Sequence, residues 1–224
     1  MVFHFENKET GFSASLFHDT RDNSYTLSFR GTDNGPDWGN GNVQAYSPSA
    51  PQYEQAITLA KRLQVVLGDQ FTDITGHSLG GGLGAASSML TGIRATTFNA
   101  PGLNPETVTS RGGTWDTSRA ESLITNYRVN DEVLTSLQER GSIGSVPLSL
   151  LTPIIGPSAI VLNGIAASLP NAAGRQITIN AFNQSNQSMS WLERNNLFQM
   201  QPVALHGMDY VMRGMLINNT KSPQ

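Results

Sequence analysis

Residues 73–86 read DITGHSLGGGLGAA, and Ser78 has a glycine two positions before it and another two positions after it. This G-x-S-x-G pattern is typical of a sharp strand-to-helix turn that holds a nucleophilic serine in a strained backbone conformation. The alternative is a serine in an ordinary glycine-rich loop, because 22 glycines in 224 residues make chance matches easy. The neighbouring elements decide between these two interpretations.

A serine hydroxyl needs a base to take its proton, and the usual base is a histidine oriented by a carboxylate. The chain has four histidines, His4, His18, His77 and His206. Hydrolases with this turn have the chain order serine, acid, histidine, and only His206 follows Ser78. Gly207 beside it and a predicted helix after it place His206 on a loop. We therefore predict His206 as the base.

The acid should lie between Ser78 and His206, where the candidates are Glu106, Asp116, Glu121, Asp131, Glu132, Glu139 and Glu193. Asp131 ends a predicted strand, which puts its carboxylate at the same edge of the sheet as Ser78. Glu132 would face the other way if strand alternation continues. Asp116 is typical of a surface loop or a helix cap. We predict Asp131 as the acid.

An oxyanion hole needs hydrogen-bond donors directed at the negative charge that develops on the substrate. We expect one donor to be the backbone N–H of Leu79, directly after the serine. The second donor must come from another loop near the edge of the sheet, and residues 28–38, SFRGTDNGPDW, are its natural source.

The elements that position these residues follow from hydrophobic periodicity and from glycine and proline signals. They are an antiparallel hairpin over 11–32, helices over 51–67, 81–92, 104–112 and 208–219, and strands over 71–75, 93–102, 123–133 and 175–182. Strands that alternate with helices indicate a parallel sheet, and α/β sheets bind ligands at the carboxyl ends of their strands. We predict an α/β-hydrolase-like α/β fold, with a mostly parallel sheet, an N-terminal hairpin and helices on both faces, as one domain over 1–224. This context favours the interpretation of Ser78 as a nucleophile.

Composition excludes several classes of function. With 14 Lys and Arg against 17 Asp and Glu, the net charge of −3 provides no basic surface for nucleic acid. The absence of cysteine excludes disulfides, thiolate metal sites and a thiol nucleophile. We expect neither a metal nor a cofactor. The first residues, MVFHFENKETG, contain no basic segment followed by an apolar run, so we expect no signal peptide in this chain and leave its cellular location undetermined.

Five segments occur in order along the chain: FRGT with Trp38 downstream, DITGHSLGGGLGA, NAPG, VNDEV and the late His206. Together they resemble the class 3 lipases, the family of the fungal triacylglycerol lipases. The resemblance implies that Thr32, after the Arg-Gly pair, supplies a backbone N–H and often a hydroxyl to the oxyanion hole. It also implies that Arg30 is structural and holds this loop in place.

This chain departs from that family in two ways. Family members carry helices before the first strand, so we expect this chain to be a domain of a longer protein. The segment where the family has its lid, residues 33–50, has little apolar content beyond Trp38, Val43 and Tyr46, so no amphipathic lid is expected there. The chain also resembles lipase toxin domains that bacteria inject into rivals, which implies a neutralising immunity protein as a partner.

Residues 141–174 form a stretch without a single charged or aromatic side chain. Four prolines interrupt it, so it offers no run near the roughly 20 residues that a membrane-spanning helix needs. Three interpretations remain open: core segments with turns, an apolar flap that meets lipid, and a docking surface for a partner.

The residues predict a serine ester hydrolase that acts on lipids at a membrane surface, a phospholipase A or an acylglycerol lipase. Two alternatives remain, which are an esterase or thioesterase for soluble substrates and a non-enzymatic binding protein with the same fold. A complete set of Ser78, Asp131 and His206 argues against the binding protein.

Overall fold

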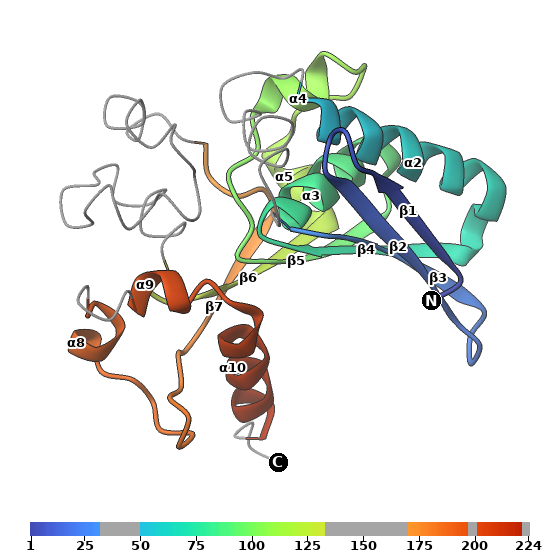
Figure 1. Ribbon diagram of the computed structural model, residues 1–224. Coiled ribbons are helices and arrows are strands. Elements are labelled where there is room, and N and C mark those ends of the chain that lie inside the picture. Colours follow the sequence, from blue (N-terminus) through green and yellow to red (C-terminus); the bar gives the residue numbers. More distant parts are fainter. Residues whose placement is uncertain (32–49, 133–169, 197–200, 221–224) are drawn as a thin grey trace. The chain divides into compact units, whose positions relative to one another are not determined.

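The computed structural model describes residues 1–31, 50–132, 170–196 and 201–220 (Figure 1). Contacts divide the chain into a first unit, Met1–Asn126 with Pro170–Arg175, and a second unit, Tyr127–Leu169 with Gln176–Gln224. The single domain expected over residues 1–224 stays a prediction.

The strands form a mixed sheet in chain order, β1-β2-β3-β4-β5-β6-β7. Their bounds are β1 (Phe3–Asn7), β2 (Phe12–Asp19), β3 (Ser24–Phe29), β4 (Phe71–His77), β5 (Arg94–Phe98), β6 (Ile124–Val129) and β7 (Arg175–Ile179). Strand β2 pairs antiparallel with β1 and with β3, whereas β4 pairs parallel with β3 and with β5. The predicted α/β fold with its N-terminal hairpin is confirmed.

The helices agree with the sequence where the apolar pattern is long. They are α2 (Pro51–Leu67), the 3-10 turn η2 (Gly68–Gln70), α3 (Leu79–Thr91), α4 (Pro105–Thr109), α5 (Thr117–Leu123), α8 (Trp191–Arg194), α9 (Gln201–Ala204) and α10 (Met208–Thr220). Helix α2 begins with Pro51 in its first turn and ends at Gly68, whose φ is +54°, as the sequence indicates. Strand β1 and helices α5, α8 and α9 were not predicted.

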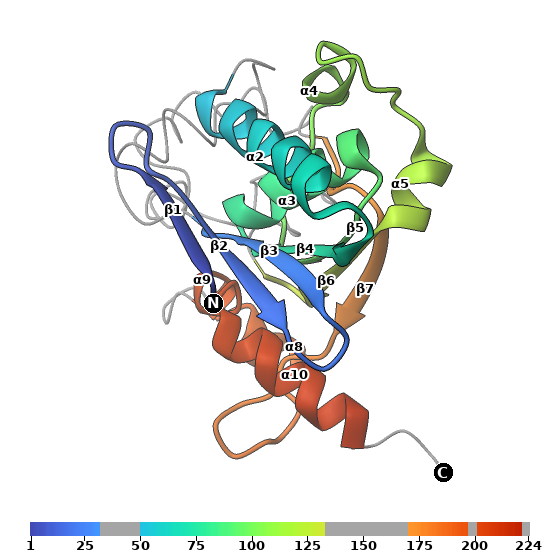
Figure 2. The same cartoon turned by 90° about the vertical axis from the view of Figure 1, so that its right-hand side faces the viewer.

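Helices α2 and α3 of the first unit cover the same face of its strands (Figure 2). The core between them and the sheet includes Leu27, Ile74 and Leu83, all fully buried. Helix α3 can approach its neighbours closely because it is rich in glycine. A Cβ on Gly82 would lie 2.2 Å from the hydroxyl of Tyr53, a buried side chain of α2 whose pKa is raised by desolvation.

Close backbone packing also joins the last helix of the second unit to the end of β7. A Cβ on Gly214 of α10 would lie 2.8 Å from the carbonyl oxygen of Asn180. The N–H of Asn130, just after β6, donates to the carbonyl of Ile179 at 3.0 Å. The region after β6 is therefore held against the end of β7.

Of the described helices, none has the length and apolar character needed to cross a membrane. The apolar segment 141–174 lies outside the described residues except for its last five. Its three interpretations therefore stay predictions.

We expect Gly80→Ala to disrupt the fold and Gly84→Ala to be tolerated, although both glycines lie in α3. A Cβ on Gly80 would lie 2.3 Å from the carbonyl oxygen of Phe29, whereas the nearest atom to one on Gly84 is the Ile74 Cγ2 at 3.3 Å. Backbone cannot yield as a side chain can, so Gly80→Ala should lower the free energy of unfolding by about 3 kcal/mol or more. Gly84→Ala should change it by no more than about 1 kcal/mol. Urea unfolding of both variants tests this, and equal losses would contradict it.

Candidate active site

Ser78 lies at a sharp turn between β4, which ends at His77, and α3, which begins at Leu79. Its φ of 55° and ψ of −129° are unfavourable for a residue with a side chain. Hydrogen bonds hold this conformation from two directions. The Ser78 N–H donates to the carbonyl of Phe98 in β5 at 2.9 Å, and the N–H of Gly81 donates to the Ser78 carbonyl at 2.8 Å. The strained turn expected from the G-x-S-x-G pattern is present.

Glycines make this turn possible because three backbone segments meet there. A Cβ on Gly76 would lie only 2.2 Å from the Gly80 carbonyl oxygen, and one on Gly80 would lie 2.3 Å from the Phe29 carbonyl oxygen, so both pattern glycines are required sterically. A Cβ on Gly31 would lie 2.9 Å from the His77 carbonyl oxygen and 3.4 Å from the Ser78 Cβ. The chain just before Thr32 therefore passes beside the serine, while Thr32 itself lies outside the described residues.

The residue after the serine, Leu79, is the first of α3, and its side chain is buried in the core. The first N–H groups of a helix have no acceptor within the helix and carry its positive dipole end. The position of Leu79 therefore suits an amide that stabilises negative charge next to Ser78.

His206 lies in the second unit, on the short turn between α9 and α10. Its Nδ1 is 2.9 Å from Oε2 of Glu132, and the two side chains are 11% and 1% exposed. When the Glu132 carboxylate is ionised it only accepts hydrogen bonds, and Nδ1 of a neutral ring then carries the proton. The neutral ring then has Nε2 as its proton acceptor, the arrangement that a general base requires.

Asp131, predicted as the acid, lies next to the residue that contacts His206. Strand β6 ends at Val129, and the Glu132 N–H then donates to the Val129 carbonyl at 3.3 Å, which closes a turn. Within this turn Asp131 has a φ of 61°, so strand alternation does not continue and Glu132 is the residue that reaches His206. The Asp131 carboxylate accepts from Nε of Arg194 at 2.8 Å. In the described residues the carboxylate that contacts His206 is therefore that of Glu132, next to the predicted Asp131, and the positive φ that brings it there has no signal in the sequence.

The N-terminal histidines have local partners, as expected of structural or surface residues. His4 contacts the Ser15 hydroxyl at 3.1 Å, and His18 contacts the Asn23 side chain at 2.8 Å. Asp116 caps α5 by accepting from the Ser118 N–H at 2.9 Å, so its interpretation as a helix cap is confirmed.

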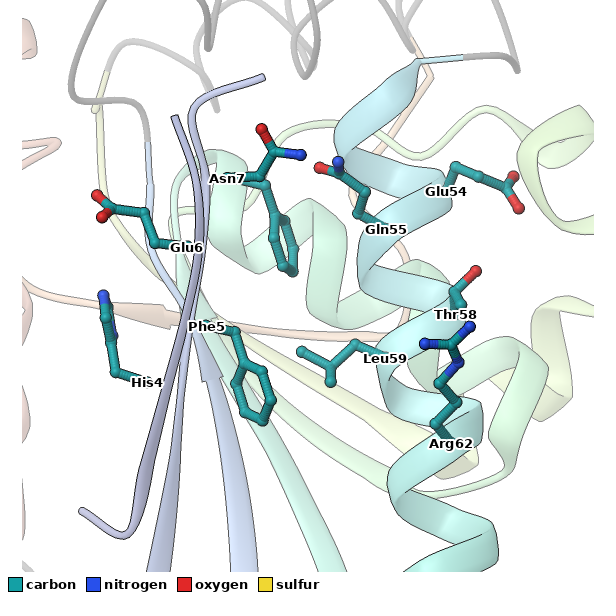
Figure 3. Close-up of a pocket in the computed structure, with 10 residues that line it drawn as sticks. His4, Phe5, Glu6, Asn7, Glu54, Gln55, Thr58, Leu59 and Arg62 are labelled. Carbon is teal, nitrogen blue, oxygen red and sulfur yellow. The ribbon is translucent and has the colours of Figure 1, made fainter. Parts of the chain in front are cut away.

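A hollow of about 520 Å³ lies between β1 and α2 of the first unit (Figure 3). In this view Phe5 and Leu59 point toward each other across it, and Asn7 and Gln55 approach each other at one end. None of the residues predicted to do chemistry lines this hollow. The hollow therefore contains none of the candidate catalytic residues.

Comparisons of the sequence with known proteins give a consistent result. A family model for phospholipase-like proteins, the Tle-like phospholipase domain, matches residues 2–185. An extracellular phospholipase A1 of Serratia liquefaciens is 29% identical over 211 residues, which cover 92% of this chain and 56% of that protein. The chain therefore spans about half the length of this relative.

Solved structures of fungal lipases are similar to this chain at low sequence identity. A lipase from Rhizopus microsporus var. chinensis has a TM-score of 0.46 at 14% identity, over 92% of this chain and 71% of its own. A Rhizomucor miehei lipase–propeptide complex has a TM-score of 0.44 at 12% identity, over 92% of this chain and 66% of its own.

The strained backbone at Ser78 predicts that its glycine variant is more stable than its alanine variant, the reverse of the usual order within a helix. Glycine tolerates this conformation, whereas alanine carries strain of about 1–3 kcal/mol. Ser78→Gly should therefore be about 1 kcal/mol more stable than Ser78→Ala in urea unfolding. Ser87, in the interior of α3, is the control, and there the alanine variant should be the more stable by about 1 kcal/mol. The same order at both positions would contradict the strain.

Proposed function

The chain belongs to the Tle-like phospholipase domain family, and we propose that it hydrolyses an acyl ester of a phospholipid through a covalent intermediate on Ser78. The observation that carries the proposal is the strained turn that presents Ser78 between β4 and α3. The name of the Serratia relative, a phospholipase A1, supports a phospholipid as the substrate class.

In the proposed reaction the Ser78 Oγ attacks the ester carbonyl carbon while its proton passes to Nε2 of His206. The tetrahedral intermediate then collapses, the ester C–O bond breaks, and the leaving lysolipid alcohol takes the proton from Nε2. Water attacks the acyl-enzyme with the same base, which releases the fatty acid and restores the serine.

Glu132 is the acid of this proposal in place of Asp131. Its carboxylate faces Nδ1 of His206 at 2.9 Å in a buried setting, where it fixes the tautomer and stabilises the imidazolium that forms. Asp131, whose carboxylate instead contacts Arg194, is assigned no part in the proton transfer.

The proposed oxyanion hole consists of the N–H groups of Leu79 and Thr32 together with the Thr32 hydroxyl. Leu79 begins α3 directly after the serine. The support for Thr32 is its resemblance to the class 3 lipase position together with the closeness of Gly31 to Ser78. We further propose a membrane surface as the site of action. The immunity protein expected from the resemblance to toxin domains remains a prediction that a binding assay with a neighbouring gene product would test.

Four variants test the assignment by release of fatty acid from phosphatidylcholine vesicles and of p-nitrophenol from a short ester. We expect Ser78→Ala and His206→Ala each to lower kcat by about 10⁴–10⁶, and Glu132→Gln to lower it by about 10⁴. Asp116→Asn is the control, because asparagine caps a helix as well as aspartate does and should leave kcat unchanged.

The outcome on the two substrates distinguishes the alternatives. Activity on vesicles that exceeds activity on the short ester supports a lipid hydrolase, and the reverse indicates a soluble ester or thioester. More than a few per cent of the activity left in Ser78→Ala would overturn the covalent mechanism.

Thr32 provides a separate test of the oxyanion hole. Thr32→Val removes the hydroxyl and keeps the N–H, and we expect it to lower kcat by about 10² while Thr32→Ser restores most of it. An unchanged kcat in Thr32→Val would exclude the hydroxyl as a donor.

A further inference from the structure

The ion pair of Asp131 and Arg194 lies one residue from Glu132 in the second unit. Nε of Arg194 donates to Oδ2 of Asp131 at 2.8 Å, and the two side chains are only 17% and 14% exposed. Nη1 of the same guanidinium donates to the Met189 carbonyl. A largely buried arginine that makes two directed hydrogen bonds restrains its partner far more than an exposed ion pair does.

The restrained residue has a backbone conformation that is unfavourable by itself. Asp131 has a φ of 61°, in the left-handed region that a residue with a side chain enters only at some cost. Such a conformation persists when its surroundings hold it, and this one turns the chain so that Glu132 reaches His206. Whatever holds Asp131 therefore also sets the position of the Glu132 carboxylate.

Arg194 is itself held at a defined place. It ends α8, whose capping box joins Ser190 and Glu193. The Ser190 hydroxyl and N–H both donate to the Glu193 carboxylate, at 2.7 and 2.6 Å, and they hold the pKa of that carboxyl below its usual range. The helix that carries Arg194 is thus fixed at its start.

The contacts close into a ring. The Asn130 side chain accepts from the N–H of Ala181 at 2.9 Å, and the Ala181 carbonyl accepts from the N–H of Met189 at 3.0 Å. The Met189 carbonyl accepts a hydrogen bond from Arg194, and Arg194 also donates to the Asp131 carboxylate. The ring therefore begins and ends on two adjacent residues of the turn that carries Glu132.

We propose that Arg194 is a positioning residue, which through Asp131 holds the turn after β6 in the conformation that presents Glu132 to His206. The proposal rests on the proposed function, since it matters for catalysis only if Glu132 and His206 act on Ser78. It assigns Arg194 no contact with the substrate.

The test measures kcat and KM on a short p-nitrophenyl ester for Arg194→Gln, Arg194→Lys and Asp131→Asn. A small misplacement of catalytic groups costs up to about 10²-fold in rate, so we expect Arg194→Gln and Asp131→Asn to lower kcat roughly 10- to 100-fold with KM unchanged. Arg194→Lys keeps the charge and one hydrogen bond and should recover part of the loss. Asp131→Asn keeps the size and shape of the side chain, so it still tests the proposal if Arg194→Gln does not fold.

The first unit provides a control. Arg111, 14% exposed where Arg194 is 17% exposed, donates through Nε to Glu54 at 2.8 Å and through Nη1 to the Thr107 carbonyl at 3.0 Å. It therefore makes the same types of contact, with a carboxylate that is 61% exposed. Arg111→Gln should leave kcat unchanged. An equal fall of kcat in Arg111→Gln would show that loss of any such ion pair lowers activity, and would overturn the proposal.

A double-variant cycle identifies the route of the effect. If Arg194 acts through Glu132, adding Arg194→Gln to Glu132→Gln should lower kcat less than 3-fold further, because the carboxylate that it positions is gone. A full 10- to 100-fold further loss, or no loss in the single variant, would overturn the positioning role. Retained activity in Ser78→Ala or Glu132→Gln would instead overturn the proposed function, so the two failures are distinguishable.

Discussion

The close approach of three backbone segments around Ser78 is the constraint on which the first unit depends. The end of β4, the first turn of α3 and the end of β3 meet where Gly76 and Gly80 have no Cβ. Any side chain there would push the helix off the sheet. The same approach forces the serine into its strained conformation, because only a very sharp turn takes the chain from strand to helix within one residue.

A second constraint acts in the other unit, where a carboxylate is almost completely removed from water. Burying an ion costs several kcal/mol unless a partner and directed hydrogen bonds compensate. Glu132 faces His206, and the adjacent Asp131 faces Arg194, so each of two neighbouring carboxylates has its own cationic or hydrogen-bonding partner. Because the two carboxylates have different partners, their electrostatic surroundings differ although the two residues are adjacent in the chain. The same contacts give the turn after β6 a defined structure.

Long amphipathic segments were predictable because their own pattern determines them. The helices over Pro51–Leu67 and Met208–Thr220 coincide with the sequence expectations to within a residue. The four-residue helices α8 and α9 were missed, since so short a segment has no periodicity to detect. Strand β1 was missed although Phe3 and Phe5 alternate with polar residues, a weak signal that becomes a strand only through pairing with β2.

By itself the sequence determined which residue types could do chemistry. The turn glycines selected Ser78, and the shortage of histidines left His206 as the candidate base on a loop before the last helix. Only the tertiary structure showed that the carboxylate in contact with His206 is that of Glu132 and not that of Asp131. Two adjacent carboxylates cannot be ranked by composition or spacing, since neither predicts the positive φ of Asp131 or its ion pair with an arginine 63 residues away in the chain. Contacts between residues so far apart in the chain leave no local pattern in the sequence, so only the folded structure shows them.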